Sequence, residues 1–159
     1  MNRLSRTLKV LMLMSLGLTI ASTGVQGQED QAFLTYRQKL MASIGANMGA
    51  IGVILKTGLP FTDKIQMHAY QMQLSSTLIE AAFEKEITAG RTDAKPEIWQ
   101  EWDKFVAAAQ KLGEESGKLG VVAKAGDQEA LAAQIKATGK SCGGCHKPYR
   151  KPKGERFER

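Results

Sequence analysis

The sequence predicts an all-α fold, an antiparallel up-down-up-down four-helix bundle. Apolar residues recur at helical spacing in four separate segments. No stretch shows the sustained alternation of a strand, and β-branched residues are sparse. Short connections separate the four segments, and short connections place consecutive helices antiparallel to one another.

The first two helices are expected at about residues 30–56 and from Thr62 or Asp63 to the neighbourhood of Gly90. Pro60 cannot continue the first helix, and Gly90 is a plausible C-terminal stop for the second. Their apolar stripes keep steps of three, four and seven residues. The stripes comprise Phe33, Leu40, Met41, Ile44, Met48, Ile51 and Leu55, and then Ile65, Met72, Ile79, Phe83 and Ile87.

The third helix is expected to begin at Pro96, because proline suits the first turn of a helix. Gly113, Gly117 and Gly120 are expected to weaken its later turns. The fourth helix should follow Asp127, whose side chain can cap its first turn.

The most informative motif lies in the fourth segment, where Cys142-Gly-Gly-Cys145-His146 has the C-x-x-C-H pattern of a c-type haem attachment site. The two thiols would form thioether bonds to the porphyrin, and the histidine would be the proximal iron ligand. Cys142 and His146 are four residues apart and so share one helical face. The motif therefore predicts one covalent haem c on the inward face of the last helix.

Two other readings of the motif are weaker. A thioredoxin-type redox pair would follow a strand, and none is expected here. A structural zinc site needs four ligands, but the chain has no third cysteine and only one other histidine, His68. A second haem ligand from His68 is conceivable, although a lone histidine on a bundle helix is more often a surface or core-edge residue.

Residues 1–27 resemble a secretory signal peptide, with Arg3, Arg6 and Lys9 before a short apolar stretch. An uncleaved anchor is the alternative, but the apolar stretch is short for a membrane span. We expect cleavage, a periplasmic location, no membrane span in the mature chain, and a single domain over residues 28–159.

The chain carries a net charge of +6, and removal of the three basic signal residues leaves +3. Basic residues gather at the C-terminus, where they could dock an acidic partner or form a solvated end. Nucleic acid is not an expected partner, because an exported chain without a binding motif gives no reason for one. Redox partner proteins are expected, with no sequence signal for their identity, and the chain could be a monomer or a homodimer.

The segment Cys142–Arg150, with its aromatic-arginine pair after the haem motif, resembles the C-terminus of the class II cytochromes c. This family comprises the cytochromes c′ and c-556. The segments Arg37–Gly45, Lys56–Asp63 and Pro96–Phe105 resemble other conserved parts of the same family. The resemblance covers essentially the whole mature chain and implies a four-helix bundle with haem near one end.

The resemblance also implies a distal residue at Met41 and a family arginine at Arg37, which could pair with a haem propionate. Methionine at the distal position is typical of the c-556 type, in which sulfur and histidine both bind the iron. Pro148 departs from the family pattern and should bend or end the helix near Tyr149. The expected iron ligands are therefore His146 and Met41.

From these features we expect a one-electron carrier with low-spin iron, and not an enzyme. The alternative is a protein like cytochrome c′ that binds nitric oxide or carbon monoxide at an open distal site. A peroxidase-like enzyme is a third possibility, but it needs a distal acid–base group, and Arg37 is the one candidate on the first helix.

Overall fold

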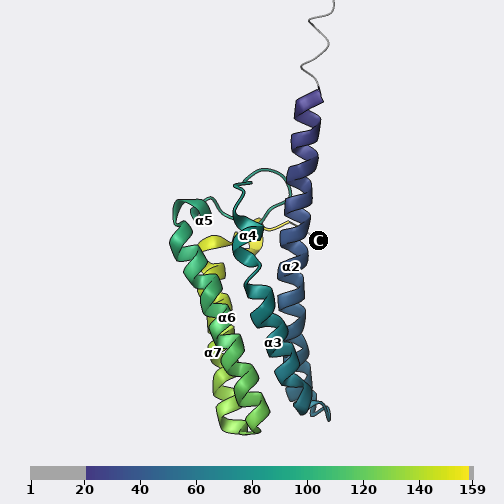
Figure 1. The fold of residues 1–159 in the computed structure, drawn as a ribbon, viewed down its shortest axis with the longest axis vertical. Coiled ribbons are helices and arrows are strands. Elements are labelled where there is room, and N and C mark those ends of the chain that lie inside the picture. Colours follow the sequence, from purple (N-terminus) through teal and green to yellow (C-terminus); the bar gives the residue numbers. More distant parts are fainter. Residues whose placement is uncertain (1–20, 158–159) are drawn as a thin grey trace, which may run out of the picture. The chain divides into compact units, whose positions relative to one another are not determined.

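The computed structural model describes residues 21–157, with side chains described from residue 27. Figure 1 shows an all-α chain, and no β-strand occurs among the described residues. The elements are α2 (Ala21–Thr57), η1 (Thr62–Lys64), α3 (Ile65–Ser76), α4 (Ile79–Phe83), α5 (Glu97–Gln100), α6 (Trp102–Ala125), α7 (Gln128–Tyr149) and η2 (Lys153–Glu155).

The chain divides into two compact units, residues 1–33 and 34–159, and α2 runs from one into the other. The predicted signal peptide lies mostly outside the described residues, and its last part, from Ala21, is helical as the start of α2. Of the described helices, α2 alone, over Gly27–Thr57, is long and apolar enough to cross a membrane. This evidence is weak, because a helix that supplies core residues passes the same test.

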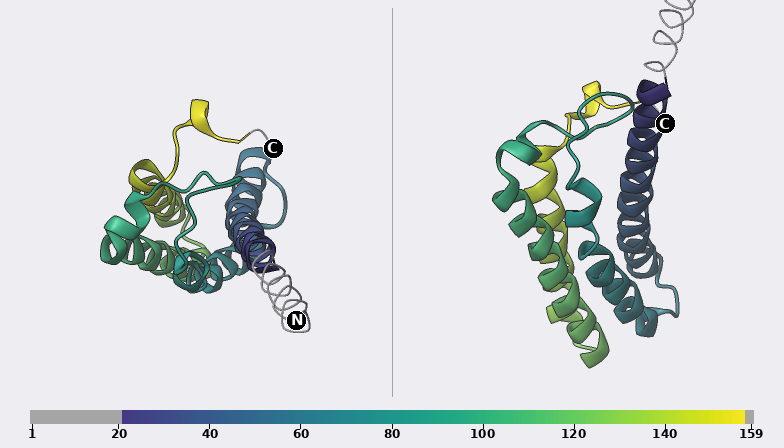
Figure 2. Two further views of the ribbon diagram at one scale, coloured as in Figure 1. Left: turned by 90° about the horizontal axis from the view of Figure 1, so that it is seen from above. Right: turned by 45° about the horizontal axis from the view of Figure 1, so that its top comes forward.

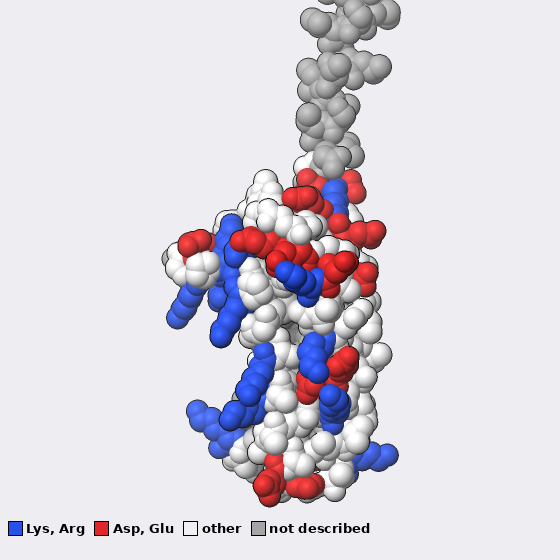
Figure 3. All heavy atoms as spheres, turned by 90° about the vertical axis from the view of Figure 1, so that its left-hand side faces the viewer, with Lys and Arg blue, Asp and Glu red and all other residues white. Residues whose placement is uncertain are grey.

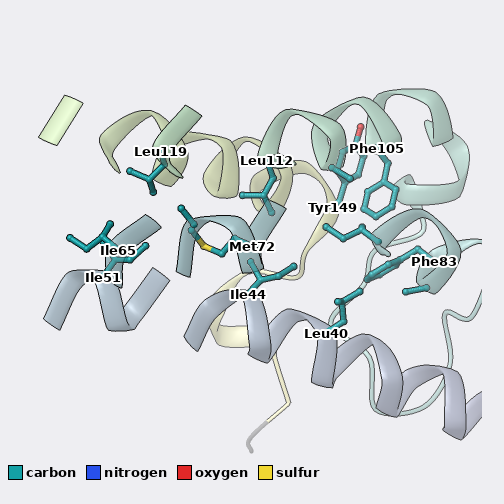
Figure 4. Packing of buried hydrophobic residues seen from close by; sticks show 14 of the residues in the cluster. Leu40, Ile44, Ile51, Ile65, Met72, Phe83, Phe105, Leu112, Leu119 and Tyr149 are labelled. Atoms are coloured by element: carbon teal, nitrogen blue, oxygen red, sulfur yellow. The ribbon is translucent and has the colours of Figure 1, made fainter. Parts of the chain in front are cut away.

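The second unit is the predicted four-helix bundle. Its four layers are the 34–57 part of α2, the pair α3 and α4, the pair α5 and α6, and α7. One hydrophobic cluster joins all of them, and Figure 4 shows its side chains meeting between the helices. Ile51, Ile65, Met72, Ile98 and Leu119 are its most deeply buried large members.

The predicted second helix is interrupted. It ends at Ser76 and resumes as α4 at Ile79, and a tight turn joins the two parts. The Leu78 amide donates to the Ser75 carbonyl at 3.2 Å, so a short-range bond replaces the helical ladder there. Gly90 has a positive φ of 79° but lies in the loop beyond α4, so it is not the helix stop that was expected.

The third helix is also interrupted, at Glu101, where φ of −125° and ψ of 43° separate α5 from α6. The expected weakening at Gly113, Gly117 and Gly120 is absent, because α6 runs unbroken to Ala125. These glycines instead allow a close approach of α3 to α6. A methyl group on Gly113 would lie 2.6 Å from Ser76 Oγ, a contact that requires movement.

Charged side chains of both signs are interspersed on the face shown in Figure 3. Several of these charged residues form ion pairs along α6. Glu115 lies 2.9 Å from Lys111 Nζ and 3.0 Å from Lys118 Nζ, and it accepts a 2.7 Å bond from Gln134 on α7. Glu115 thus links the third and fourth layers of the bundle on one side.

Candidate haem-binding site

The C-x-x-C-H motif lies in the last two turns of α7. This helix begins as predicted at Asp127, whose carboxylate accepts a 3.0 Å bond from the Ala130 amide. It ends at Tyr149, one residue after Pro148, in agreement with the expected effect of a proline there. Cys142 and Cys145 are partly buried and pack against the hydrophobic core. The two cysteines of the motif therefore face the interior of the bundle.

Both cysteines and His146 line a cavity of about 580 Å³ inside the second unit. This volume lies in the range of sites that hold organic cofactors. Apolar and aromatic side chains from every layer of the bundle form most of its wall. They include Met41, Ile44, Phe83, Ile98, Phe105 and Leu112.

The chemistry of these donors fits haem c. Two free thiols and an imidazole face one apolar cavity, as covalent attachment with a proximal histidine requires. Burial, with the nearby charges of Arg150 and Arg156, lowers the pKa of His146, which favours the neutral imidazole that can bind iron. Haem attachment is thus consistent with the residues present.

The two competing readings of the motif find no support in the structure. Burial raises the pKa of Cys142 and raises that of Cys145 to about 11, whereas a redox-active C-x-x-C pair has a lowered thiol pKa. Among the described residues, no group of three or more His, Cys, Asp or Glu side chains could hold a metal ion. A redox pair and a zinc site are both disfavoured.

Met41 lies on the wall that α2 contributes to this cavity, as its predicted distal position requires. The same wall includes Leu34, Ala42 and Gly45 and is mainly apolar. Met41 is partly buried and packs against the hydrophobic core. In this structure its side chain is therefore a packing residue within the cavity wall.

Arg37 has a structural role that the sequence did not indicate. Its side chain is 3% exposed, and its Nε donates a 2.6 Å bond to the Ala82 carbonyl. Another guanidinium nitrogen donates to the Lys85 carbonyl. The guanidinium also lies over the rings of Phe83 and Trp99, at 4.8 and 5.5 Å from their centroids. Arg37 thus holds α2 against the end of α4.

An aromatic cluster supports the cavity on the side of α5 and α6. Phe105 lies 5.2 Å from Phe83 and 5.5 Å from Tyr149, the latter in an edge-to-face arrangement. Tyr149 is 5% exposed and donates a 3.3 Å bond to Glu101. Trp99 donates a 2.8 Å bond to the Phe83 carbonyl, which links α5 to α4.

His68 does not belong to the cavity wall. Its Nδ1 lies 2.8 Å from Asn47 Oδ1, which makes it a link between α3 and α2. The structure therefore gives no support to a bis-histidine haem.

Asp93 and Phe157 are among the cavity residues that the sequence reasoning did not identify. Asp93 lies in the loop between α4 and α5, and Phe157 lies beyond α7, yet both contribute to the wall. Neither belongs to a motif or a periodic stripe. Only the return of the chain end toward this loop brings them to the site.

The described fold and site match known proteins. The family model described as "Cytochrome C'" matches residues 32–150. A cytochrome c′ of Rhodospirillum rubrum is 29% identical, over 89% of this chain and 97% of the relative. A cytochrome c-556 of Agrobacterium tumefaciens (strain II Chrys) is 32% identical, over 72% of this chain and 93% of the relative.

Solved structures with the same fold include cytochrome c prime from Shewanella frigidimarina, with a TM-score of 0.71 and 30% identity. That match covers 77% of this chain and 97% of the other. A nitric oxide complex of a variant of cytochrome c prime from Alcaligenes xylosoxidans has a TM-score of 0.68 and 31% identity. It covers 77% of this chain and 97% of that one.

These comparisons overturn the predicted function. The predicted low-spin electron carrier with histidine and methionine iron ligands is contradicted, because the matching family model and the matching solved structures are those of cytochromes c′, several of them complexes with nitric oxide. The physical reason for the error is that a methionine on an apolar helix face can be either a ligand or a packing residue. Spacing along the sequence does not distinguish these two roles.

Proposed function

The chain belongs to the cytochrome c′ family, and on this premise we propose that it binds nitric oxide or carbon monoxide at an open distal site of a high-spin haem. Its cofactor is one covalently attached haem c. Relatives solved as nitric oxide and carbon monoxide complexes support this reading.

Three residues of α7 would hold the cofactor. Cys142 and Cys145 would form the two thioether bonds, and His146 would bind the iron from the proximal side. When bound, the haem would supply an iron that can bind a small diatomic ligand. The two partly buried thiols and the imidazole of His146, whose pKa is lowered, line the cavity in which this chemistry would occur.

One observation carries the proposal: the α2 wall of the cavity is apolar, and its one cationic side chain is engaged elsewhere. Arg37 binds the Ala82 and Lys85 carbonyls, so it is committed to holding α4. Met41 and Leu34 contribute thioether and hydrocarbon surface to this wall. Such a wall suits an uncharged gas and provides no acid–base group of the kind a peroxidase requires.

We further propose that the chain is exported to the periplasm, that residues 1–27 are removed, and that the mature protein binds ligands without acting as an enzyme. The apolar stretch after Arg3, Arg6 and Lys9 supports export, as does the attachment of haem c outside the cytoplasm. The partners of such a protein are small gases and a source of electrons for the iron.

Absorption and magnetic spectra of the purified protein test this function. We expect a high-spin ferric spectrum without the far-red thioether-to-iron band, and ready binding of carbon monoxide to the ferrous protein. Met41→Leu should leave the spin state unchanged, because leucine keeps an apolar wall. Met41→Ala should accelerate carbon monoxide binding by enlarging the cavity.

Met67→Leu is the matched control, because Met67 is 53% exposed on α3 and does not line the cavity. Met67→Leu should change neither the absorption spectrum nor the rate of carbon monoxide binding. A low-spin wild-type spectrum whose far-red band disappears in Met41→Leu would contradict the proposal.

A further inference from the structure

The segment that follows α7, residues 151–157, lies beyond the part of the chain that matches the family model, which ends at residue 150. It contains the short helix η2, drawn in yellow in Figure 2, and it is bonded to Asp93 in the loop between α4 and α5. We call this segment the C-terminal strap. Its path brings its last described residue, Phe157, into the wall of the haem cavity.

Asp93 forms hydrogen bonds with both ends of the strap. At the near end, the Asp93 carbonyl accepts a 2.8 Å bond from the Lys151 amide, and its carboxylate lies 3.2 Å from the Arg150 guanidinium. At the far end, the other carboxylate oxygen accepts a 3.1 Å bond from the Phe157 amide. The Asp93 side chain is only 10% exposed, so these charge-assisted bonds form in a sheltered position.

Internal contacts of the strap add to this attachment. The Arg156 Nε donates a 2.8 Å bond to the Lys151 carbonyl, which closes the turn around η2. Two cations lie near the Phe157 ring, Lys151 Nζ at 5.7 Å and the Arg91 guanidinium at 5.9 Å from its centroid. Both contacts favour the observed position of the ring.

At this end the cavity wall meets solvent, as it also does at Ala42, Gly45 and Gly49 on α2 and at His146 on α7. Gln38, Arg91 and Phe157 all line the cavity and are exposed, and Phe157 is the large apolar side chain among them, 38% exposed. Gln38 donates a 2.8 Å bond to the carbonyl of Arg91, the residue whose side chain lies near the Phe157 ring, so α2 is linked to the same rim. Removal of the Phe157 ring would open this rim.

We propose that the C-terminal strap closes this end of the haem cavity and that Phe157 determines which ligands enter there. The selective part rests on the proposed function, because it needs an iron position that accepts external ligands. The closure of the cavity against solvent does not depend on that function. A strap of this kind would pass small diatomic gases and hinder bulkier ligands.

The test uses the haem-loaded protein and Phe157→Ala. The first measurement is the change in haem absorption when ethylene glycol is added, which reports contact of solvent with the haem whether or not the iron binds ligands. We expect this change to rise about twofold, because an opened rim admits solvent. The second compares association rates of n-butyl isocyanide and carbon monoxide, and their ratio should rise about threefold.

Three further variants keep the proposal falsifiable. Phe157→Leu should restore most of the closure, since it keeps an apolar side chain at the rim. Asp93→Ala should reproduce the effect of Phe157→Ala and speed hydrogen exchange at the Phe157 amide about tenfold, because the bond that protects that amide is lost. Phe61→Ala, at a 48% exposed phenylalanine outside the cavity, should change nothing.

If Phe157→Ala and Phe61→Ala give the same glycol response, the strap does not close the cavity, and the inference is wrong. If wild type binds neither isocyanide nor carbon monoxide, the proposed function fails, and so does the selective part of this inference. The glycol response then still decides whether the strap shields the haem.

Discussion

Replacement of Gly120 by alanine tests the close approach of α3 to α6. Gly120 is buried on α6 and faces the ring of Tyr70 on α3. A Cβ at this position would lie 2.7 Å from Tyr70 Cδ1 and 2.8 Å from Cζ, well inside van der Waals contact. Since several atoms of one ring are involved, the ring or the whole helix must move.

Two opposing effects determine how much Gly120→Ala changes the free energy of unfolding. Alanine in a helix interior is favoured over glycine by about 1 kcal/mol. Insertion of a methyl group into a closely packed interface costs about 1–3 kcal/mol. Because the obstacle is an aromatic ring rather than the tip of a flexible chain, we take the upper part of that range. The net loss of unfolding free energy is then about 1–2 kcal/mol.

The matched control is Gly52→Ala on α2, where nothing lies within 4 Å of an added Cβ. Only the propensity gain applies there, so this variant should be more stable by about 0.5–1 kcal/mol. Thermal unfolding of the haem-loaded proteins, followed by circular dichroism, measures both. We expect Gly120→Ala to lower Tm by about 4–8 °C. If it raises Tm as much as Gly52→Ala does, the close-packing argument is refuted.

Two further predictions concern α6 and α7. Hydrogen bonds from Lys111, Gln134 and Lys118 lower the pKa of Glu115 to about 2, below its usual 4.5. The ionised carboxylate of Glu115 therefore stabilises the fold at a pH above the pKa that it has in the unfolded chain. This stabilisation is lost as the pH falls through the pKa that Glu115 has in the folded protein. The excess stability of wild type over Glu115→Gln, measured by denaturant unfolding, should shrink between about pH 5 and pH 2, and a constant difference would contradict this. Asp127→Ala should cost about 1 kcal/mol by loss of the cap on α7, whereas Asp127→Asn should cost little; equal losses in thermal unfolding would exclude the cap.

The sequence was sufficient to predict the bundle because apolar periodicity reports directly which faces of the helices are buried. It was not sufficient to locate the breaks at Thr77–Leu78 and at Glu101, since neither site contains the proline or glycine that usually marks an interruption. The role of Gly120 was also misjudged. Helix propensity treats a glycine as a weakness, but the structure shows that its missing side chain makes room for Tyr70.

Site residues could be predicted where their signal is local in the sequence and could not be predicted where their role depends on distant residues. Cys142, Cys145 and His146 were assigned from local spacing alone, and the structure brings them to one cavity. The engagement of Arg37 by the Ala82 and Lys85 carbonyls depends on residues far away in the chain, so no local pattern could reveal it.

Both helix breaks lie on the side of the bundle that contains the haem cavity, and this placement suggests why they occur. Ile79 and Phe83 follow the first break, Ile98 precedes the second, and all three line the cavity. The rest of α3 packs closely against the glycine-bearing turns of α6, where Gln73 and Tyr70 approach the glycine backbone. Two uninterrupted helices in such close contact would leave little room for a planar cofactor between them and α7. The interruptions let the same two layers pack tightly in one half of the bundle and enclose a haem in the other.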